Sequence, residues 1–433
     1  MPDSTIRHVH ARRVWDSRGR PTVEAEVTTA GGAVGRAIAP AGASTGSGEA
    51  VDRRDGGTAF GGLDVRGALA AIRDEIAPAI AGMDAAGQAA LDARLIELDG
   101  TANKARLGGN ATIAVSMAAA HATAAAHGLP LWRWLAGDGA DGPVVMPLPE
   151  IQIFGGGAHA DARVDLQDFM VVCPGAENFA QALDWTAEVY RAAGALMAAA
   201  GKRQGVADEG GWWPVFADNE EAIATLALAI ERAGFRAGEQ VAIALDVAAT
   251  QFGRDGAYRL RLDERDYDRG EWAERVAGWV ARHPIVSVED PMAEDDPAGM
   301  AQVTAAIGDR ALVVGDDFLV TSAARIEAAA RDRACTAALI KPNQAGTLTE
   351  TRAALDAARA AGMRTIVSAR SGETEDVTVV HLAVGWQADQ LKVGSFARSE
   401  RMAKWNEALR IEEGLGERAR FRAGQIFPGQ GRP

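Results

Sequence analysis

Residues 285–290 read Ile-Val-Ser-Val-Glu-Asp, a short apolar run that ends in two acidic residues. Such a run, rich in β-branched residues, favours a buried β-strand. Similar runs recur downstream: residues 312–317 read Leu-Val-Val-Gly-Asp-Asp, and residues 338–341 read Ala-Leu-Ile-Lys. Each is followed by an alanine-rich segment with apolar residues at helical spacing. A repeated strand–helix unit predicts an α/β fold with a parallel sheet.

Charged residues close each of these runs and predict a closed barrel. Six strands are expected to end at or beside a charged residue, namely Asp246, Glu289, Asp316, Lys341, Arg370 and Lys392. Successive members lie 22 to 43 residues apart, which is room for one strand, one helix and two loops. This many units favours a (β/α)8 TIM-type barrel over a doubly wound sheet, and the first unit lacks a glycine-rich phosphate fingerprint. Because the strand ends of a barrel meet at one face, we expect these side chains to share one pocket.

The N-terminal part of the chain has a different pattern. Residues 22–27 alternate strictly between apolar and polar, and residues 33–38 have the composition of a partner strand. These features predict an antiparallel sheet. Residues from about 64 to 136 carry apolar side chains at helical spacing and few β-branched residues, so we expect helices there.

The length of the chain predicts two domains. A chain of 433 residues exceeds one ordinary hydrophobic core. The glycine-, aspartate- and proline-rich segment 137–143 is the clearest linker. We therefore expect an α+β domain over residues 1–138 and a barrel domain over residues 143–433.

Composition excludes some partners. Hydrophobic residues make up 48% and charged residues 24%, which is ordinary for a globular protein. A net charge of −14 argues against nucleic acid as a partner, although a local cationic site can still bind a small anion. Cys173 and Cys335 fit no ligand spacing and suit a reducing compartment. With no signal peptide or membrane span recognisable, we expect a cytoplasmic protein with no membrane partner.

Three carboxylates at strand ends predict a metal site. Asp246, Glu289 and Asp316 follow successive strands. Each alone is more often a helix cap, but converging anions repel one another unless a cation lies between them. Hard oxygen ligands without His or Cys suit Mg²⁺. The acids that follow, Asp290 and Asp317, are more simply caps or supports of this site.

Two lysines and an arginine predict further chemistry at the same face. Desolvation at the end of an apolar strand lowers the pKa of Lys341 or Lys392 toward that of a useful base. Ion pairs with the carboxylates are the alternative, and both can hold. Arg370 and Ser371 make a plausible clamp for a phosphate, whereas Ala369 beside them offers no polar group.

Other motifs are weaker when taken singly. Glu209, in the sequence Asp-Glu-Gly-Gly, could act as a general acid near a metal, although such turns are common. His159 stands in a glycine-rich turn, where a lone histidine is usually structural. Taken together, a Mg²⁺ site, a lysine base, a glutamate acid and an anion clamp favour one reaction class. It is proton abstraction beside a metal-bound carboxylate, followed by loss of a β-leaving group.

Several longer motifs occur through nearly the whole chain. They read WDSRGRPTVE at 15–24, GASTG at 42–46, DEGG at 208–211, ALDVAA at 244–249, VEDP at 288–291, GDD at 315–317, GTLTET at 346–351, RSGETED at 370–376 and RSER at 398–401. With these motifs in this order, the sequence resembles the enolase family. The resemblance implies an α+β domain that caps a modified (β/α)8 barrel. It also implies a Mg²⁺-dependent hydro-lyase that acts on a small phosphorylated or phosphonylated carboxylic acid, assembled as a homodimer or a larger homo-oligomer.

Residue roles follow from matching positions. The resemblance implies a first Mg²⁺ on Asp246, Glu289 and Asp316, and a second, substrate-assisted one held with help from Ser44. It implies that Lys341 is the base and Glu209 the acid. The remaining positions are implied to bind substrate or to assist catalysis, and they are His159, Gln167, Asp168, Ala369, Arg370, Ser371 and Lys392.

Departures from the family pattern cluster around this site. Enolases usually have His at the position of Ala369 and Glu at the position of Asp168. The flanks change as well, at residues 155–159, 212–213 and 342–345 and at Val393. The metal ligands and the acid–base pair are kept, while the residues around them differ.

Three functional hypotheses remain. The first is an enolase that interconverts 2-phosphoglycerate and phosphoenolpyruvate, as in glycolysis. The second is a specialised paralogue resembling carboxyphosphonoenolpyruvate synthase of phosphinic-acid antibiotic pathways, because Ala369 and Asp168 make room for a larger phosphorus group. The third is a non-catalytic binding protein with this fold, against which the retained Lys341 and Glu209 argue.

Overall fold

The computed structural model describes residues 2–429 of the protein. Its N-terminal domain contains the predicted antiparallel sheet, formed by β1 (Ile6–Trp15), β2 (Pro21–Thr29) and β3 (Val34–Ile38) in that order. Strand β2 pairs with both neighbours, and Thr28 lies opposite Val34 in the second pair. The alternation in the sequence therefore predicted this sheet correctly.

Helices cover this sheet, as the sequence predicts for residues 64 to 136. They are α1 (Arg66–Ala71), the π-helix η2 (Ile72–Ile76), α2 (Ala77–Ile80), α3 (Gln88–Asp99), α4 (Gly109–Ala126) and α5 (Leu131–Ala136). Helix α4 packs on β2 and β3 and is buried along nearly its whole length. Its alanines allow a close approach, and a Cβ added to Gly35 of β3 would overlap the backbone of Ala122. Small residues thus bring α4 and the sheet together.

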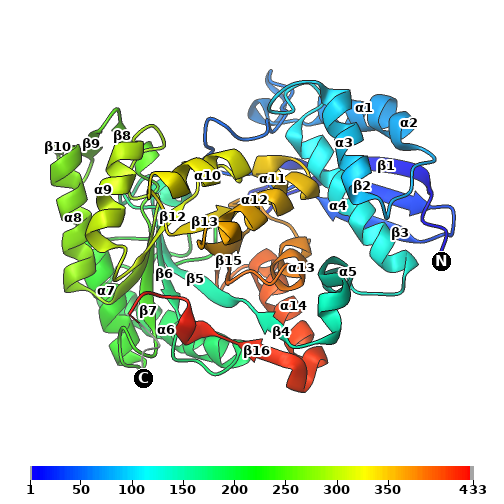
Figure 1. Ribbon diagram of the computed structural model, residues 1–433. Helices are drawn as coiled ribbons and strands as arrows, with labels where there is room; N and C mark the ends of the chain where they lie inside the picture. The colour runs from blue at the N-terminus through cyan, green and yellow to red at the C-terminus, as the bar shows by residue number, and fades with distance from the viewer. Residues whose placement is uncertain (1, 430–433) are drawn as a thin grey trace.

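The second domain is a closed eight-stranded barrel (Figure 1). Its strands in spatial order are β5 (Leu148–Gly155), β6 (Asp168–Val172), β7 (Ala242–Asp246), β11 (Ile285–Glu289), β12 (Leu312–Gly315), β13 (Ala337–Ile340), β14 (Arg364–Ser368) and β15 (Gln390–Ser395). The predicted TIM-type barrel and its α/β class are therefore confirmed. Outside it, β4 (Val144–Met146) pairs with β16 (Ala419–Phe421) near the C-terminus.

One strand departs from the predicted parallel arrangement. Strand β6 is antiparallel to both β5 and β7. The connection from β5 to β6, residues 156–167, contains only the short turn Gly157–Ala160 and no crossover helix. A parallel return requires a longer crossover, usually a helix, so the chain turns back as a hairpin. The family resemblance implied a modified barrel without saying where, and the reversed strand β6 is the modification observed.

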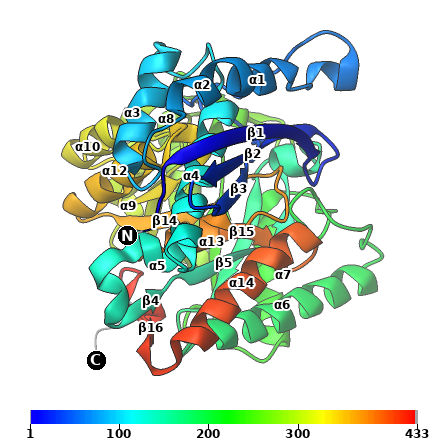
Figure 2. The same ribbon diagram turned by 90° about the vertical axis from the view of Figure 1, so that its right-hand side faces the viewer.

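Helices surround the barrel strands. They are α6 (Phe179–Ala199), α7 (Asn219–Arg232), α8 (Arg269–Arg282), α9 (Pro297–Ile307), α10 (Ala323–Arg331), α11 (Pro342–Ala345), α12 (Leu348–Ala360), α13 (Thr378–Gly385) and α14 (Ser399–Leu415). Helices α6 and α14 pack against each other (Figure 2). A small antiparallel sheet, β8 (Gly253–Arg254), β9 (Ala257–Leu260) and β10 (Arg265–Asp268), precedes α8. Within residues 2–429, no helix is both long and apolar enough to cross a membrane.

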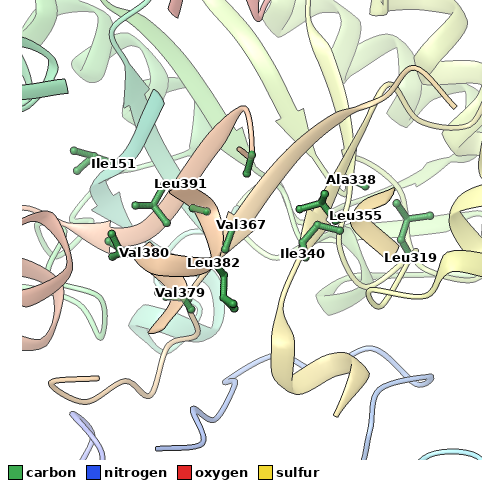
Figure 3. Close-up of a cluster of buried hydrophobic side chains, with 14 of the residues drawn as sticks. Ile151, Leu319, Ala338, Ile340, Leu355, Val367, Val379, Val380, Leu382 and Leu391 are labelled. Atoms are coloured by element: carbon green, nitrogen blue, oxygen red, sulfur yellow. The ribbon is translucent and has the colours of Figure 1, made fainter. Parts of the chain in front are cut away.

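Two apolar layers hold the barrel together. One lies inside it and includes Met170, Ala244 and Ile366. The other lies between the strands and the outer helices, where Val367 of β14 is close to Leu382 of α13 (Figure 3). Side chains alternate between the two faces of a strand, so each strand serves both layers. Buried apolar surface of this kind is the main favourable term in folding.

Side chains of the N-terminal domain also cap a barrel helix. Asp92 accepts hydrogen bonds from the backbone N–H and the hydroxyl of Thr349, and Ser116 accepts one from the backbone N–H of Leu348. These donors belong to the first turn of α12, whose amides have no partner within the helix. The two domains are thereby joined by buried polar contacts as well as by apolar packing.

Two histidines meet at the same domain interface. His121 of α4 lies 2.9 Å from the hydroxyl of Thr378, and its ring centroid is 6.2 Å from that of His381 on α13. His381 Nδ1 has no hydrogen-bond partner, and Glu407 lies 3.6 Å from its Nε2. Burial lowers the pKa of both rings, and that of His381 falls to about 4. The folded protein therefore keeps this pair neutral.

Acid should destabilise the protein through this pair. Because its folded pKa is lowered from an unfolded value near 6.5, His381 stabilises the fold above about pH 6.5, and this contribution is lost as pH falls toward 4. We expect the melting temperature to fall between about pH 7.5 and pH 5, and to fall less in His381→Gln, by the equivalent of about 1–3 kcal/mol. An equal pH dependence in both proteins, measured by calorimetry, would contradict the assignment.

Candidate active site

A small polar hollow lies at the C-terminal face of the barrel. Eleven of the predicted site residues line it, namely Ser44, His159, Gln167, Asp168, Glu209, Asp246, Lys341, Ala369, Arg370, Ser371 and Lys392. Ser368, Val393 and Gly394 complete the lining. The other two predicted residues, Glu289 and Asp316, contact the lysines that line the hollow. The structure thus brings all the predicted side chains together.

The three predicted metal ligands meet around two lysines. Lys392 Nζ lies 2.9 Å from Asp246 Oδ2 and 2.7 Å from Glu289 Oε2. Lys341 Nζ donates a hydrogen bond to Asp316 Oδ2. All five side chains are buried, so each charge is compensated within the site rather than by water.

These contacts correct the predicted direction of the lysine pKa shifts. Burial does lower the pKa of Lys341, but the nearby Asp316 carboxylate outweighs it and the pKa is raised. Burial likewise opposes the charge on Lys392, while Asp246 and Glu289 raise its pKa well above the ordinary value. The ion-pair alternative therefore describes both lysines. Desolvation alone did not predict the direction of these pKa shifts, because the strand ends that exclude water from the lysines also place carboxylates beside them.

The acids fit a divalent cation. Glu289 Oε1 is buried and has no hydrogen-bond partner, and burial together with Asp246 raises the Glu289 pKa well above its ordinary value. An acceptor of this kind suits a bound cation. Oxygen ligands from Asp246, Glu289 and Asp316 suit Mg²⁺. Asp290 accepts hydrogen bonds from the backbone N–H groups of Asp316 and Asp317, at 2.8 and 2.7 Å, and so orients this turn.

A second group of polar side chains lies across the hollow. His159 Nδ1 is 2.9 Å from Asp168 Oδ1, and His159 Nε2 is 2.9 Å from Ser371 Oγ and 3.7 Å from Glu209 Oε1. Although burial opposes it, the two carboxylates raise the His159 pKa to about 9. Burial raises the pKa of Glu209, but His159 and other cations outweigh it, so the Glu209 pKa is lowered. The two neighbouring carboxylates thus favour the charged form of the His159 ring.

The predicted anion clamp has a buried partner that the sequence did not reveal. The Arg370 guanidinium contacts both carboxylate oxygens of Glu49, at 2.9 and 3.2 Å. It also donates to Asn343 Oδ1 at 3.0 Å and to the Ser44 carbonyl at 2.8 Å. Glu49 follows the loop of small residues at 41–48, and no signal in the sequence places it beside Arg370, which is 321 residues away.

The loop that carries Ser44 is tied to the barrel at more than one point. Besides the Ser44 carbonyl, the Ser47 backbone N–H and hydroxyl donate to Glu294 Oε2 at 2.9 and 3.1 Å. Ala43 N donates to Ser371 Oγ at 3.2 Å. The N-terminal domain therefore contributes Ser44 to the lining of the hollow.

Comparison with known proteins identifies the family. Residues 143–428 match the model described as "Enolase, C-terminal TIM barrel domain", and residues 6–135 match "Enolase, N-terminal domain". The chain is 48% identical to the enolase of Acidothermus cellulolyticus over 425 residues, which covers 98% of each chain. It is 46% identical to enolase 1 of Desulfitobacterium hafniense over 434 residues, covering 100% of this chain and 99% of the other. The chain belongs to the enolase family.

The two main departures from the enolase pattern lie in the same hollow. Ala369 presents only a methyl group, and its backbone N–H donates to the Lys392 carbonyl at 2.9 Å. Asp168 lies on the other side, in contact with His159, and its Oδ2 is 3.8 Å from Lys392 Nζ. Both changes are therefore placed where they can alter what this enolase-family site accepts.

Several buried polar residues of this enolase-family chain were not anticipated from the sequence. They are Glu49 of the N-terminal domain and, in the barrel domain, Glu150, Gln152, Asn343, Gln344 and Arg401. Glu150 and Gln152 lie on β5, a strand that the sequence analysis did not identify. Burial raises the Glu150 pKa to about 7. Arg401 donates to the carbonyls of Arg370 and Ser371 and so holds the anion clamp from behind.

Replacing Glu49 should make the protein depend on an added anion. Glu49→Gln leaves the buried Arg370 without its counter-charge, and breaking such a pair costs about 3–5 kcal/mol. We expect a lower melting temperature in phosphate-free buffer, and a larger rise on adding about 10 mM phosphate than in the wild type.

Glu350→Gln is the matched control for this measurement. Glu350 pairs with the buried Lys104 at 2.7 Å, outside the hollow lining. Phosphate should not restore the stability of this variant. An equal rise in melting temperature with phosphate in both variants would contradict the assignment of Arg370 as an anion-binding residue.

Proposed function

We propose that the protein is a Mg²⁺-dependent hydro-lyase that removes the C2 proton of 2-phosphoglycerate and eliminates water to give phosphoenolpyruvate. The main support is that Lys341, Glu209 and the Arg370–Ser371 clamp line one hollow. Full-length identity of 46% and 48% to proteins named enolase supports the same activity. Two Mg²⁺ ions per site, the second held with Ser44, complete the proposal.

Substrate binding in this proposal uses the cations of the hollow. Arg370 and Ser371 bind the phosphate, and Lys392 binds the carboxylate, because charge-assisted hydrogen bonds to oxyanions are strong in a buried site. Asp246, Glu289 and Asp316 would hold Mg²⁺, which would supply positive charge where negative charge develops on the substrate carboxylate. Gln167 donates to Asp246 Oδ2 at 3.0 Å and so orients one of these acids.

The proton steps are assigned to side chains on the two sides of the hollow. Lys341 Nζ takes the C2 proton as the neutral amine, so the ammonium proton that it donates to Asp316 must first leave to solvent. The leaving hydroxyl receives a proton from Glu209. Since the Glu209 pKa is lowered, this proton reaches Oε1 from His159 Nε2, which lies 3.7 Å away and is protonated at neutral pH. Asp168 assists by holding the imidazole.

The proposal includes a domain boundary between residues 138 and 143. It is supported by the family matches, which end at residue 135 and begin at residue 143. A homodimer and a cytoplasmic location follow from the family resemblance. The free cysteines, Cys173 and Cys335, are consistent with a reducing compartment.

Separating the two proton steps tests the roles of the base and the acid. With 2-phosphoglycerate and Mg²⁺ in D₂O, the wild type should form phosphoenolpyruvate and exchange the C2 proton. Lys341→Ala should lose both activities by about 10³-fold or more, whereas Glu209→Gln should lose elimination and retain exchange. NMR of the recovered substrate measures the exchange. Retained exchange in Lys341→Ala would remove Lys341 from the role of base.

A modified phosphorus-containing substrate is the alternative, as in carboxyphosphonoenolpyruvate synthase. The observation that favours it is that Ala369 and Asp168 both line the hollow. In that case turnover of 2-phosphoglycerate should be weak, and Ala369→His with Asp168→Glu should raise it by about 10² -fold or more. Wild-type turnover at the rate of an ordinary enolase would reject this alternative. Absence of Mg²⁺ binding by calorimetry would reject both enzyme proposals and leave only a non-catalytic role.

A further inference from the structure

The side chain of Gln152 is buried between Asp168 and the turn that carries Glu209. Gln152 lies on β5 and its side chain is 1% exposed. The amide Nε2 donates to Asp168 Oδ1, and Oε1 accepts a hydrogen bond from the Gly211 backbone N–H at 2.8 Å. Because a backbone N–H can only donate, the amide oxygen must face Gly211 and the NH₂ group must face Asp168.

Each end of this amide holds a group that the proposed mechanism uses. At one end, Asp168 contacts His159 Nδ1 at 2.9 Å. At the other, Gly211 closes the turn that carries Glu209, because the Gly211 carbonyl accepts from Ala207 N at 2.8 Å. The Gln152 side chain therefore contacts both Asp168, which holds the His159 imidazole, and the turn that carries Glu209.

Packing fixes the side chain in this place. A Cβ added to Gly211 would overlap Gln152 Oε1, so the turn lies directly against the amide. The Gln152 carbonyl also accepts a hydrogen bond from the Ser395 hydroxyl, at 2.5 Å. The pairing of β5 with β15 shifts register between Lys392 and Ser395, and that with β6 shifts between Gln152 and Phe154. Gln152 thus stands at a point where both ladders deviate from regular pairing.

We propose that Gln152 is a positioning residue that ties the Asp168–His159 pair to the Glu209 turn and keeps His159 Nε2 within reach of Glu209 Oε1. The role in catalysis rests on the function proposed above, whereas the two hydrogen bonds of Gln152 do not depend on it. An amide suits this place because it is a neutral donor and acceptor in one side chain. Methionine of similar length offers neither hydrogen bond, and glutamate keeps only the acceptor.

Two substitutions separate the two ends of the tie. Gln152→Met removes both hydrogen bonds. Gln152→Glu retains an acceptor for Gly211 but sets a carboxylate against Asp168, and two such groups share a proton only as pH falls. Gln390→Met is the control, because Gln390 is a fully buried glutamine of β15 whose amide atoms have no hydrogen-bond partner.

Steady-state kinetics should show a loss in kcat rather than in substrate affinity. For Gln152→Met we expect kcat to fall about 10- to 100-fold at every pH, with KM for 2-phosphoglycerate nearly unchanged. For Gln152→Glu we expect a similar loss at about pH 8 that shrinks as pH falls toward about 6, where the shared proton restores the contact with Asp168. Gln390→Met should keep the wild-type kcat and pH profile.

Hydrogen exchange tests the tie without substrate. Mass spectrometry of the segment 205–215 should show faster exchange in Gln152→Met, because Gly211 N–H loses its acceptor, and wild-type exchange in Gln152→Glu and Gln390→Met. Unchanged exchange in Gln152→Met would overturn the proposal. So would wild-type kcat in both Gln152 variants, or an equal kcat loss in Gln390→Met. If the wild type does not convert 2-phosphoglycerate, the proposed function fails. The contact between Gln152 and the Glu209 turn is then tested by hydrogen exchange alone.

Discussion

Compensation of buried charge is the constraint on which the rest of this site depends. Lys341, Lys392 and Arg370 are all buried, and each lies within hydrogen-bond distance of at least one carboxylate. An isolated buried ion costs several kcal/mol, so none of these side chains could hold its position alone. The barrel supplies the framework, but the mutual pairing of the charges sets where each one lies. A substrate or metal entering the site must therefore exchange partners with groups that are already engaged.

The N-terminal domain takes part in this compensation. Glu49 comes from that domain and neutralises an arginine of the barrel. Asp92 and Ser116 cap a barrel helix, and Asp376 of the barrel accepts a hydrogen bond from Ile38 N of β3 at 2.8 Å. A barrel without this domain would expose an uncompensated guanidinium and unsatisfied helix amides. The first domain is thus part of the site and not only a cover for it.

Much of this arrangement could be predicted from local pattern. Short apolar runs ending in charge located six barrel strands, and family motifs located the side chains that line the hollow. Strands β5 and β6 were missed because neither ends in a charged residue: β5 ends at Gly155, and the acid of the reversed strand β6, Asp168, stands at its start. Glu49 and Gln152 were missed because their partners lie far away in sequence, at Arg370 and at Asp168 and Gly211. The direction of the lysine pKa shifts depended on distances that sequence does not contain.

The reversal of β6 has a consequence for how such a site can change over evolutionary time. In a regular barrel each strand delivers only its last residues to the catalytic face, whereas β5 and β6 present the end of one strand and the start of the next. Residues 156–167 and Asp168 thus lie in one hairpin, which carries His159. Changes confined to that hairpin would alter the His159–Asp168 side of the hollow while leaving every parallel strand–helix unit in place. New substrate preferences can therefore arise there without refolding the barrel.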